Sequence, residues 1–260
     1  MLMEKRTQPG VYGYAAKDLT WRKADKKGMA LASVRASREE GKYLGYLRAD
    51  SMTETGIHQH LGPATSYFLE GGFADYDGYA GRGMLGVNLA GATHSAMAYV
   101  DTLMVSRLEA PVIYPSEDMA GNNSLHTGSY AGEIVNEHPE VSPDINIQVD
   151  GVRLARTEIE RVSRRVLFDY IGSGENRRCA HMQLLPYSEI PEFTTHEPLD
   201  IFVVGGALCV GGEWQEAGAF FVVDPGATTS IKTEFGAMIM VWSEAPITWV
   251  NADYKDPFGF

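Results

Sequence analysis

The chain has 260 residues, which is enough for one large domain or two of ordinary size. A composition with 44% hydrophobic and 22% charged residues is typical of a well-packed globular protein and excludes a disordered or fibrous one. The formal net charge of -12, without a cluster of Lys and Arg, argues against a nucleic-acid partner.

The N-terminal residues carry no export or membrane signal. Residues 1–9 are polar, and no apolar run in the chain approaches the roughly 20 residues needed to span a bilayer. The two cysteines, Cys179 and Cys209, are too few for a disulfide scaffold. We therefore expect a cytoplasmic protein with no membrane partner.

Short apolar runs bounded by Gly, Asp or Pro predict β-strands along most of the chain. In chain order, the predicted strands cover residues 43–47, 67–69, 73–76, 102–105, 166–170, 201–204, 220–223 and 238–242. Many short strands separated by turns favour an all-β sandwich or barrel. Residues 155–163 fit either an amphipathic helix or a strand, and this choice stays open.

Two histidines lie two residues apart in the turn-flanked segment 56–64. Because alternate side chains of a strand share one face, His58 and His60 project in the same direction. Imidazole is a good ligand for Zn, Cu, Fe or Ni, so this pair makes half of a metal site. A third histidine, His94, follows the Gly-Ala-Thr turn at 91–93 and is the candidate to complete the site.

The two halves of the chain resemble each other. Residues 66–72 parallel residues 200–206 at an offset of 134, and residues 90–94 parallel residues 225–229 at an offset of 135. We interpret this similarity as a tandem duplication of one β-unit.

The segment between the halves predicts the domain boundary. Residues 111–143 are rich in Asn, Ser, Gly and Pro, as in a long loop, and the alternating run 144–154 predicts a hairpin around Asp150-Gly151. We expect an N-terminal domain at 1–112, a linker at 113–143 and a C-terminal domain at 144–260.

These segments resemble the two motifs of the cupin family. Gly56-Ile57-His58-Gln59-His60 with Gly71 resembles the first motif, and Leu89-Ala90-Gly91-Ala92-Thr93-His94 resembles the second, with Leu89 in place of its proline. The sequence of these segments is similar to that of the cupin domain of ChrR-type anti-sigma factors. It is also similar to that of dihydroxyacetophenone and acetylacetone dioxygenases. The resemblance implies an all-β bicupin, built from two tandem double-stranded β-helix (jelly-roll) barrels.

The resemblance also implies a ligand set for a metal. Alanine stands at position 64, where the family carries a glutamate ligand, so the implied set is His58, His60 and His94. Such a neutral set leaves the metal charge uncompensated and favours an anionic chelator such as an enolate. In the second half, the 134 offset matches the ligand positions to Glu192, Thr194 and Pro198, and the 135 offset matches His94 to Thr229. We therefore expect a degenerate C-terminal cupin without metal ligands.

The resemblance implies an Fe(II) dioxygenase that uses O2 to cleave a C–C bond of a small enolisable ketone, diketone or hydroxyaryl ketone. Zn, Ni or Mn stays open as the metal. One alternative is a metal-binding sensor or regulator without catalysis. The anti-sigma cupins, however, carry a helical zinc domain before the cupin, whereas the segment preceding the motifs here holds no Cys or His. Another alternative is a non-oxidative isomerase, lyase or hydrolase.

The pocket lining is predicted from strand neighbours of the motif. Tyr46, Arg48 and Tyr67 are expected beside the metal, where Arg48 could bind a substrate oxyanion, although a solvated Arg48 is an equal alternative. The sequence assigns no catalytic acid or base. A monomer and a homo-oligomer formed through exposed edge strands both stay open.

Overall fold

The computed structural model describes residues 8–24, 26–37, 39–116, 130–134 and 144–260. The described residues form 26 β-strands and three short 3-10 helices, η1 (Ala16–Asp18), η2 (Val149–Gly151) and η3 (Ile171–Ser173), without an α-helix. The all-β prediction is therefore confirmed. In this described part of the chain, no helix is long and apolar enough to cross a membrane.

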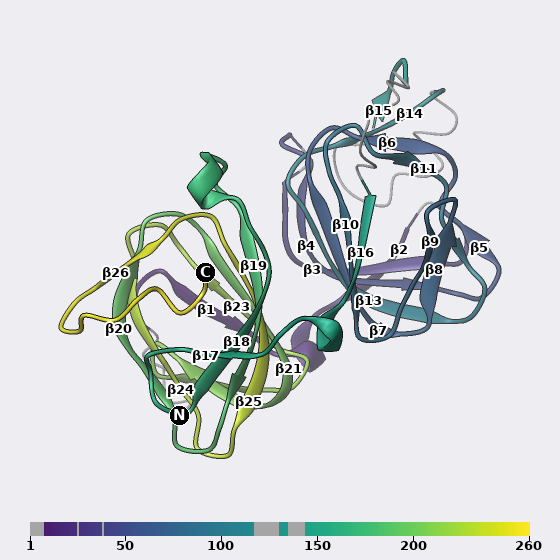
Figure 1. The fold of residues 1–260 in the computed structure, drawn as a ribbon. Helices are drawn as coiled ribbons and strands as arrows, with labels where there is room; N and C mark the ends of the chain where they lie inside the picture. Colours follow the sequence, from purple (N-terminus) through teal and green to yellow (C-terminus); the bar gives the residue numbers. More distant parts are fainter. Residues whose placement is uncertain (1–7, 25, 38, 117–129, 135–143) are drawn as a thin grey trace. The chain divides into compact units, whose positions relative to one another are not determined.

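The chain folds into two compact units, each made of curled sheets whose strands are antiparallel apart from the parallel pair β14 and β15 (Figure 1). The first barrel spans Leu19–Gly151. The second barrel combines Val152–Phe260 with the described residues that precede Leu19. This arrangement confirms two tandem jelly-roll barrels.

The first barrel has one large sheet and two small ones. The large sheet runs in the order β16-β10-β7-β13-β4-β3-β2, and the small sheets run β11-β6-β14-β15 and β5-β12-β8-β9. Its strands are β2 (Trp21–Lys23), β3 (Met29–Ser37), β4 (Lys42–Ala49), β5 (Thr53–Glu54), β6 (His58–His60), β7 (Ala64–Glu70), β8 (Gly72–Asp75), β9 (Gly78–Gly81), β10 (Met84–Asn88), β11 (Thr93–His94), β12 (Met97–Ala98), β13 (Thr102–Leu108), β14 (Val112–Tyr114), β15 (Tyr130–Ala131) and β16 (Asp144–Gln148).

The second barrel is one continuous sheet. Its main path runs β17-β18-β19-β25-β21-β24-β20-β26, while β22 and β23 pair with β21 and β1 pairs with β23. Its strands are β1 (Val11–Tyr14), β17 (Ala155–Arg156), β18 (Val162–Asp169), β19 (Arg178–Leu184), β20 (Glu189–Thr195), β21 (Leu199–Val210), β22 (Glu213–Glu216), β23 (Phe220–Val223), β24 (Thr228–Lys232), β25 (Ala237–Ser243) and β26 (Ile247–Trp249).

Edge strands place the boundaries differently from the expected 1–112 and 144–260. β1, near the N-terminus, pairs with β23 of the second barrel, and β16 pairs with β10 of the first. The expected hairpin at 144–154 does not form, because β16 turns through η2 and β17 pairs with β18 instead. An edge strand offers unpaired N–H and C=O groups to any suitable segment, so a strand's partner does not follow from its position in the sequence.

Part of the expected linker belongs to the first barrel. β14 pairs with β6, and β15 pairs with β14. Residues 117–129 and 135–143 of the expected linker lie outside the described residues. Residues 155–163, for which the sequence allowed either a helix or a strand, form β17, a turn and the start of β18 at Val162.

The two barrels pack their interiors differently. The second has one continuous hydrophobic core, which includes Phe193, Ile201, Phe221, Val241 and Phe258. In the first barrel, separate clusters form around Phe68 with Met104 and around Leu108 with Tyr114. A cavity is lined by members of both clusters.

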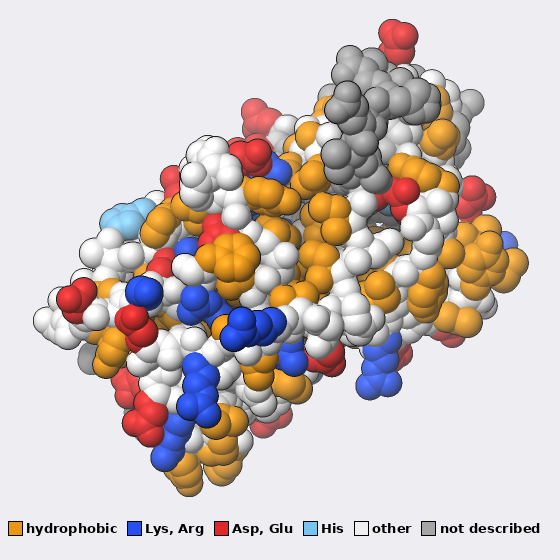
Figure 2. Space-filling view, in the orientation of Figure 1, with side chains coloured by type: hydrophobic (Ala, Val, Ile, Leu, Met, Phe, Trp, Pro, Cys, Tyr) orange, Lys and Arg blue, Asp and Glu red, His pale blue; other side chains and the backbone are white. Residues whose placement is uncertain are grey.

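Surface charge agrees with the composition. On the face drawn in Figure 2, Lys and Arg side chains lie among Asp, Glu and uncharged groups.

Candidate metal centre

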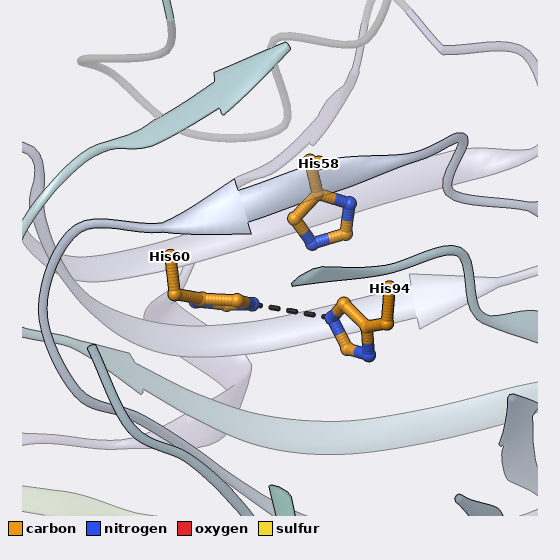
Figure 3. A group of neighbouring side chains, drawn as sticks. All are labelled: His58, His60 and His94. Carbon is orange, nitrogen blue, oxygen red and sulfur yellow. Dashed lines mark hydrogen bonds between the residues drawn. The ribbon is translucent and has the colours of Figure 1, made fainter. Parts of the chain in front are cut away.

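Three histidines converge inside the first barrel (Figure 3). His58 and His60 project from the same face of β6, and β11 places His94 directly opposite His58. Their exposed fractions are 6%, 6% and 9%, so water has little access to them. One nitrogen from each ring lies within 4.8 Å of the others. The structure therefore brings together the three residues that the sequence singles out.

The spacing of the imidazole nitrogens suits a shared metal ion. His60 Nε2 lies 3.2 Å from His94 Nε2. Two nitrogens that each bind one ion at roughly 2.1 Å lie about 3.0 to 3.4 Å apart, for angles between square and tetrahedral. The ring centroids are 4.7 to 5.2 Å apart, which holds all three rings around one point. The donor set fits a first-row transition metal.

Hydrogen bonds fix the tautomers of two of the rings. His58 Nδ1 donates to the Gly56 carbonyl oxygen at 2.8 Å, and His94 Nδ1 donates to Asp75 Oδ2 at 2.9 Å. A carbonyl or carboxylate oxygen can only accept, so each Nδ1 carries the proton and each Nε2 keeps its lone pair. Metal-binding histidines commonly have this second partner, which orients the ring and raises its basicity.

Asp75 is suited to this role by its own charge state. Burial by itself raises the pKa of the Asp75 carboxyl, but the hydrogen bond and electrostatic attraction of the His94 ring, together with the Asp77 and Gly78 backbone N–H groups, outweigh burial and bring the pKa below its usual range. Asp75 therefore stays ionised at neutral pH and accepts the His94 proton. Asp75 lies in a predicted strand, but nothing in the local sequence pairs it with a histidine.

Tyr114 is a second site residue that the sequence misses. It lies on β14, within the segment expected to be a linker, and is 1% exposed. Its ring centroid is 5.5 Å from that of His58. Burial raises the pKa of the Tyr114 phenol, so the hydroxyl stays protonated beside the histidines.

The histidines open onto a cavity of about 90 Å³. Ala64, which occupies the glutamate position of the motif, also lines this cavity, so the missing fourth ligand leaves free space. No Lys or Arg occurs among the described lining residues, and the carboxylate there, Asp75, is held by His94. The polar lining residues apart from the three histidines are Thr55, Ser66, Asp75, Asn88, Ser106, Tyr114 and Asn146.

The predicted substrate residues Tyr46, Arg48 and Tyr67 do not line the described cavity. Leu47 on β4, and Ser66 and Phe68 on β7, face the cavity. Because neighbouring side chains of a strand point to opposite faces, Tyr46, Arg48 and Tyr67 point away from the cavity. Tyr46 stacks on Trp21 instead, with ring centroids 6.0 Å apart. The Arg48 side chain is 59% exposed and lies 3.8 Å from Asp50, which corrects its placement beside the metal.

The second barrel fixes which residues match the three histidines. His94 pairs with His58 in the first barrel, and Thr229 pairs with Phe193 in the second. The bonds His60 N–Ala92 O and Gly91 N–His60 O recur as Thr195 N–Ala227 O and Gly226 N–Thr195 O. These matches give an offset of 135.

This offset corrects the expected counterparts Glu192, Thr194 and Pro198. Phe193, Thr195 and Thr229 take the places of His58, His60 and His94, and Leu199 takes that of Ala64. Gly71 and Gly206, which both have a positive φ, are separated by the same offset. A phenylalanine and two threonines offer no imidazole or carboxylate ligand, so the expectation of a degenerate second site rests on different residues.

Comparison with known proteins identifies a family model that matches part of the chain. Residues 11–111 match the ChrR cupin-like domain. No curated protein has significant sequence similarity to the chain.

Solved structures match nearly the whole chain at low identity. A candidate dioxygenase from Nostoc punctiforme has a TM-score of 0.72 and 9% identity, covering 94% of this chain and 88% of that chain. A variant of Bacillus subtilis oxalate decarboxylase has a TM-score of 0.59 and 13% identity, covering 92% and 79%. The bacterial pirin YhhW from Escherichia coli, in complex with nickel(II), has a TM-score of 0.59 and 10% identity, covering 92% and 100%.

Identities this low establish the shared fold alone. Together with the domain match over 11–111, the fold supports a relationship between this chain and the cupin superfamily. The chain has the two-barrel, or bicupin, fold.

Proposed function

We propose that the chain is a dioxygenase whose first barrel holds one Fe(II) ion. The enzyme would cleave a C–C bond in a small enolisable ketone, diketone or hydroxyaryl ketone. The observation that carries the proposal is the convergence of His58, His60 and His94 on one point beside a cavity. The fold likeness to the candidate dioxygenase from Nostoc punctiforme is consistent with it.

The residues of the site divide the work. His58, His60 and His94 would hold the metal through Nε2, while the Gly56 carbonyl and Asp75 keep two of the rings in the binding tautomer. Bound iron would supply the redox chemistry and bind an anionic chelator, because three neutral ligands leave its charge uncompensated. The buried walls formed by Phe68, Met104 and Leu108 would limit water around the substrate.

The test combines metal analysis with oxygen consumption. Protein purified without added metal is analysed for metal content, then loaded with Fe(II) under nitrogen and exposed to oxygenated buffer with candidate diketones and hydroxyaryl ketones. We expect stoichiometric iron and substrate-dependent oxygen uptake that His94→Ala abolishes and His196→Ala, at an exposed site in the second barrel, preserves. Stoichiometric zinc with no oxygen uptake by the iron-loaded form would contradict the proposal.

A non-oxidative metal-dependent enzyme is the second candidate. The fold likeness to oxalate decarboxylase is consistent with this candidate. The two candidates differ in their need for oxygen, so turnover of a candidate substrate under nitrogen by the metal-loaded protein would favour the second.

A further inference from the structure

The cavity of the first barrel contains a row of small residues that the metal site does not use. Across three neighbouring strands, Gly86 pairs with Ser66 and Ser66 pairs with Ser106. On the edge strand, Asn146 pairs with Gly86. All four residues line the cavity. The row therefore crosses the large sheet as a band of small and polar side chains.

The same row in the second barrel is built from apolar residues. Phe221 pairs with Ile201, and Ile201 pairs with Val241. Each is the counterpart of a first-barrel residue at the offset of 135, and each is at most 1% exposed in the hydrophobic core. The fold thus accepts large apolar side chains at these positions and fills the barrel with them. Small polar residues in the first barrel are therefore not a requirement of the fold.

The serine hydroxyls are available to a ligand. Within the described part of the chain, neither the Ser66 nor the Ser106 side chain has a hydrogen-bond partner. Directly opposed residues on antiparallel strands have Cβ atoms about 4.5 to 5.5 Å apart, so both hydroxyls can reach one oxygen atom. Ser66 is half-buried and Ser106 is buried, and a ligand oxygen at this row would give both hydroxyls hydrogen bonds that the surrounding side chains do not provide.

We propose that Ser66 and Ser106 form a specificity subsite that binds an uncharged oxygen, from a hydroxyl or carbonyl group, on the part of the substrate distant from the metal. Gly86 provides the space for that group, and Asn146 borders it. The inference rests on the proposed metal-dependent function, because the metal would anchor the other end of the substrate.

The charges in the cavity indicate that the ligand group at the serine row is uncharged. No Lys or Arg occurs among its described lining residues, and Asp75 is held by His94. A carboxylate or phosphate at the serine row would be buried without a cationic partner, which is strongly unfavourable. Hydroxyl and carbonyl groups need only the hydrogen bonds that serine provides.

Three matched chelators test the subsite without turnover. Allomaltol, kojic acid and comenic acid share one metal-binding hydroxypyranone and carry, at the distant ring position, a methyl, a hydroxymethyl and a carboxylate group. Their dissociation constants are measured by calorimetry on protein loaded with Zn²⁺, which is redox-inert. We expect kojic acid to bind about threefold to tenfold more tightly than allomaltol, the worth of one hydrogen bond. Comenic acid should bind most weakly.

Four variants assign the effect to residues. Ser66→Ala and Ser106→Ala should each reduce the kojic acid advantage and leave the affinity for allomaltol close to wild type. Ser188→Ala, at a buried serine of the second barrel, should preserve the advantage. Gly86→Ala should weaken all three ligands and still fold, because an added Cβ would meet Phe68 Cε2 at 3.6 Å and Asn146 Oδ1 at 3.7 Å, which are ordinary contacts.

The outcomes separate the subsite from the metal site. Equal affinities for kojic acid and allomaltol in the wild type, or an advantage that survives in both serine variants, would overturn the subsite while Zn²⁺ binding remains intact. Tighter binding of comenic acid than of kojic acid would overturn its uncharged character. Failure to bind Zn²⁺ at all would instead overturn the proposed function, and the subsite with it.

Discussion

Asp75 Oδ2 lies 2.9 Å from Nδ1 of His94, and this contact joins β8 to β11 beside the candidate metal site. The carboxylate fixes the proton on Nδ1 and leaves Nε2 directed towards His60. A contact between residues 19 positions apart thus sets the orientation of a candidate ligand.

Replacing Asp75 should weaken metal binding without abolishing it. We expect Asp75→Ala to lower the affinity for Zn²⁺ by about 10- to 100-fold, the usual effect of removing a hydrogen-bond partner from a metal-binding histidine. Asp75→Asn keeps an acceptor but loses the charge, so its effect should be smaller. Competition with a chromophoric chelator measures both affinities.

Glu54→Gln provides a matched control for Asp75. Glu54 accepts a hydrogen bond from Ser95 Oγ at 2.6 Å, beside His94 in sequence, but it does not line the cavity. Its replacement should leave the affinity for Zn²⁺ unchanged. Equal losses in Asp75→Ala and Glu54→Gln would mean that Asp75 acts only through local stability.

Metal should bind at one ion per chain. Phe193, Thr195 and Thr229 occupy the ligand positions of the second barrel and offer no good ligand set. Elemental analysis of protein saturated with metal and desalted should give one equivalent in the wild type and in His196→Ala, and close to none in His58→Ala or His60→Ala. Two equivalents per chain would reveal a second site.

Phe258 should contribute strongly to the stability of the second barrel. It is 1% exposed in the hydrophobic core, and its ring centroid lies 5.7 Å from that of Phe193. We expect Phe258→Ala to lower the free energy of unfolding by about 3 to 5 kcal/mol in urea denaturation, because the removed ring leaves a cavity.

The neighbouring Phe260 provides the control for this prediction. Phe260 is 84% exposed, so Phe260→Ala should change the free energy of unfolding by no more than about 0.5 kcal/mol. Metal stoichiometry should remain unchanged in both variants. A similar destabilisation by both would show that the C-terminal segment contributes through its backbone and not through the Phe258 ring.

The first barrel should lose stability at high pH through Tyr46. Burial raises the pKa of Tyr46 to about 12, whereas an unfolded tyrosine ionises near pH 10. Between these values the unfolded chain releases a proton that the folded barrel retains, so stability falls as pH rises, by up to about 1.4 kcal/mol per pH unit. Tyr46→Phe should show a shallower fall.

Trp21 reports this transition, because it stacks on Tyr46 and the other three tryptophans lie beyond residue 200. Urea denaturation followed by tryptophan fluorescence between pH 9 and pH 12 would compare the wild type with Tyr46→Phe. Parallel stability curves for the two proteins would mean that Tyr46 ionises in the folded barrel as readily as in the unfolded chain.

Strand existence and the histidine cluster follow from the local sequence. Apolar runs between turn residues locate the strands, and alternation along β6 directs His58 and His60 to one face. The resemblance of the Gly-Ala-Thr-His segment to the second cupin motif adds His94 as the third member. Local signals suffice where the relevant geometry spans only a few residues.

The face of the strand on which each side chain lies, and the alignment of the two barrels, could be determined only from the structure. Tyr46, Arg48 and Tyr67 lie next to cavity-lining residues in sequence, but a shift of one residue along a strand reverses its face. The same rule explains why an offset of 134 selects Glu192 and Thr194 while the paired strands select Phe193 and Thr195. A sequence match that is off by one residue therefore exchanges core and surface.

The sequence by itself determined the all-β class, the duplication and the three histidines, because each is encoded in patterns a few residues long. Only the tertiary structure decided that Asp75 orients His94, that Tyr114 enters the site, and that β1 and β16 complete the edges of the two barrels. These relationships depend on pairing between strands that are distant in the sequence. Backbone N–H and C=O groups are the same in every segment, so they do not specify which strand will pair with which.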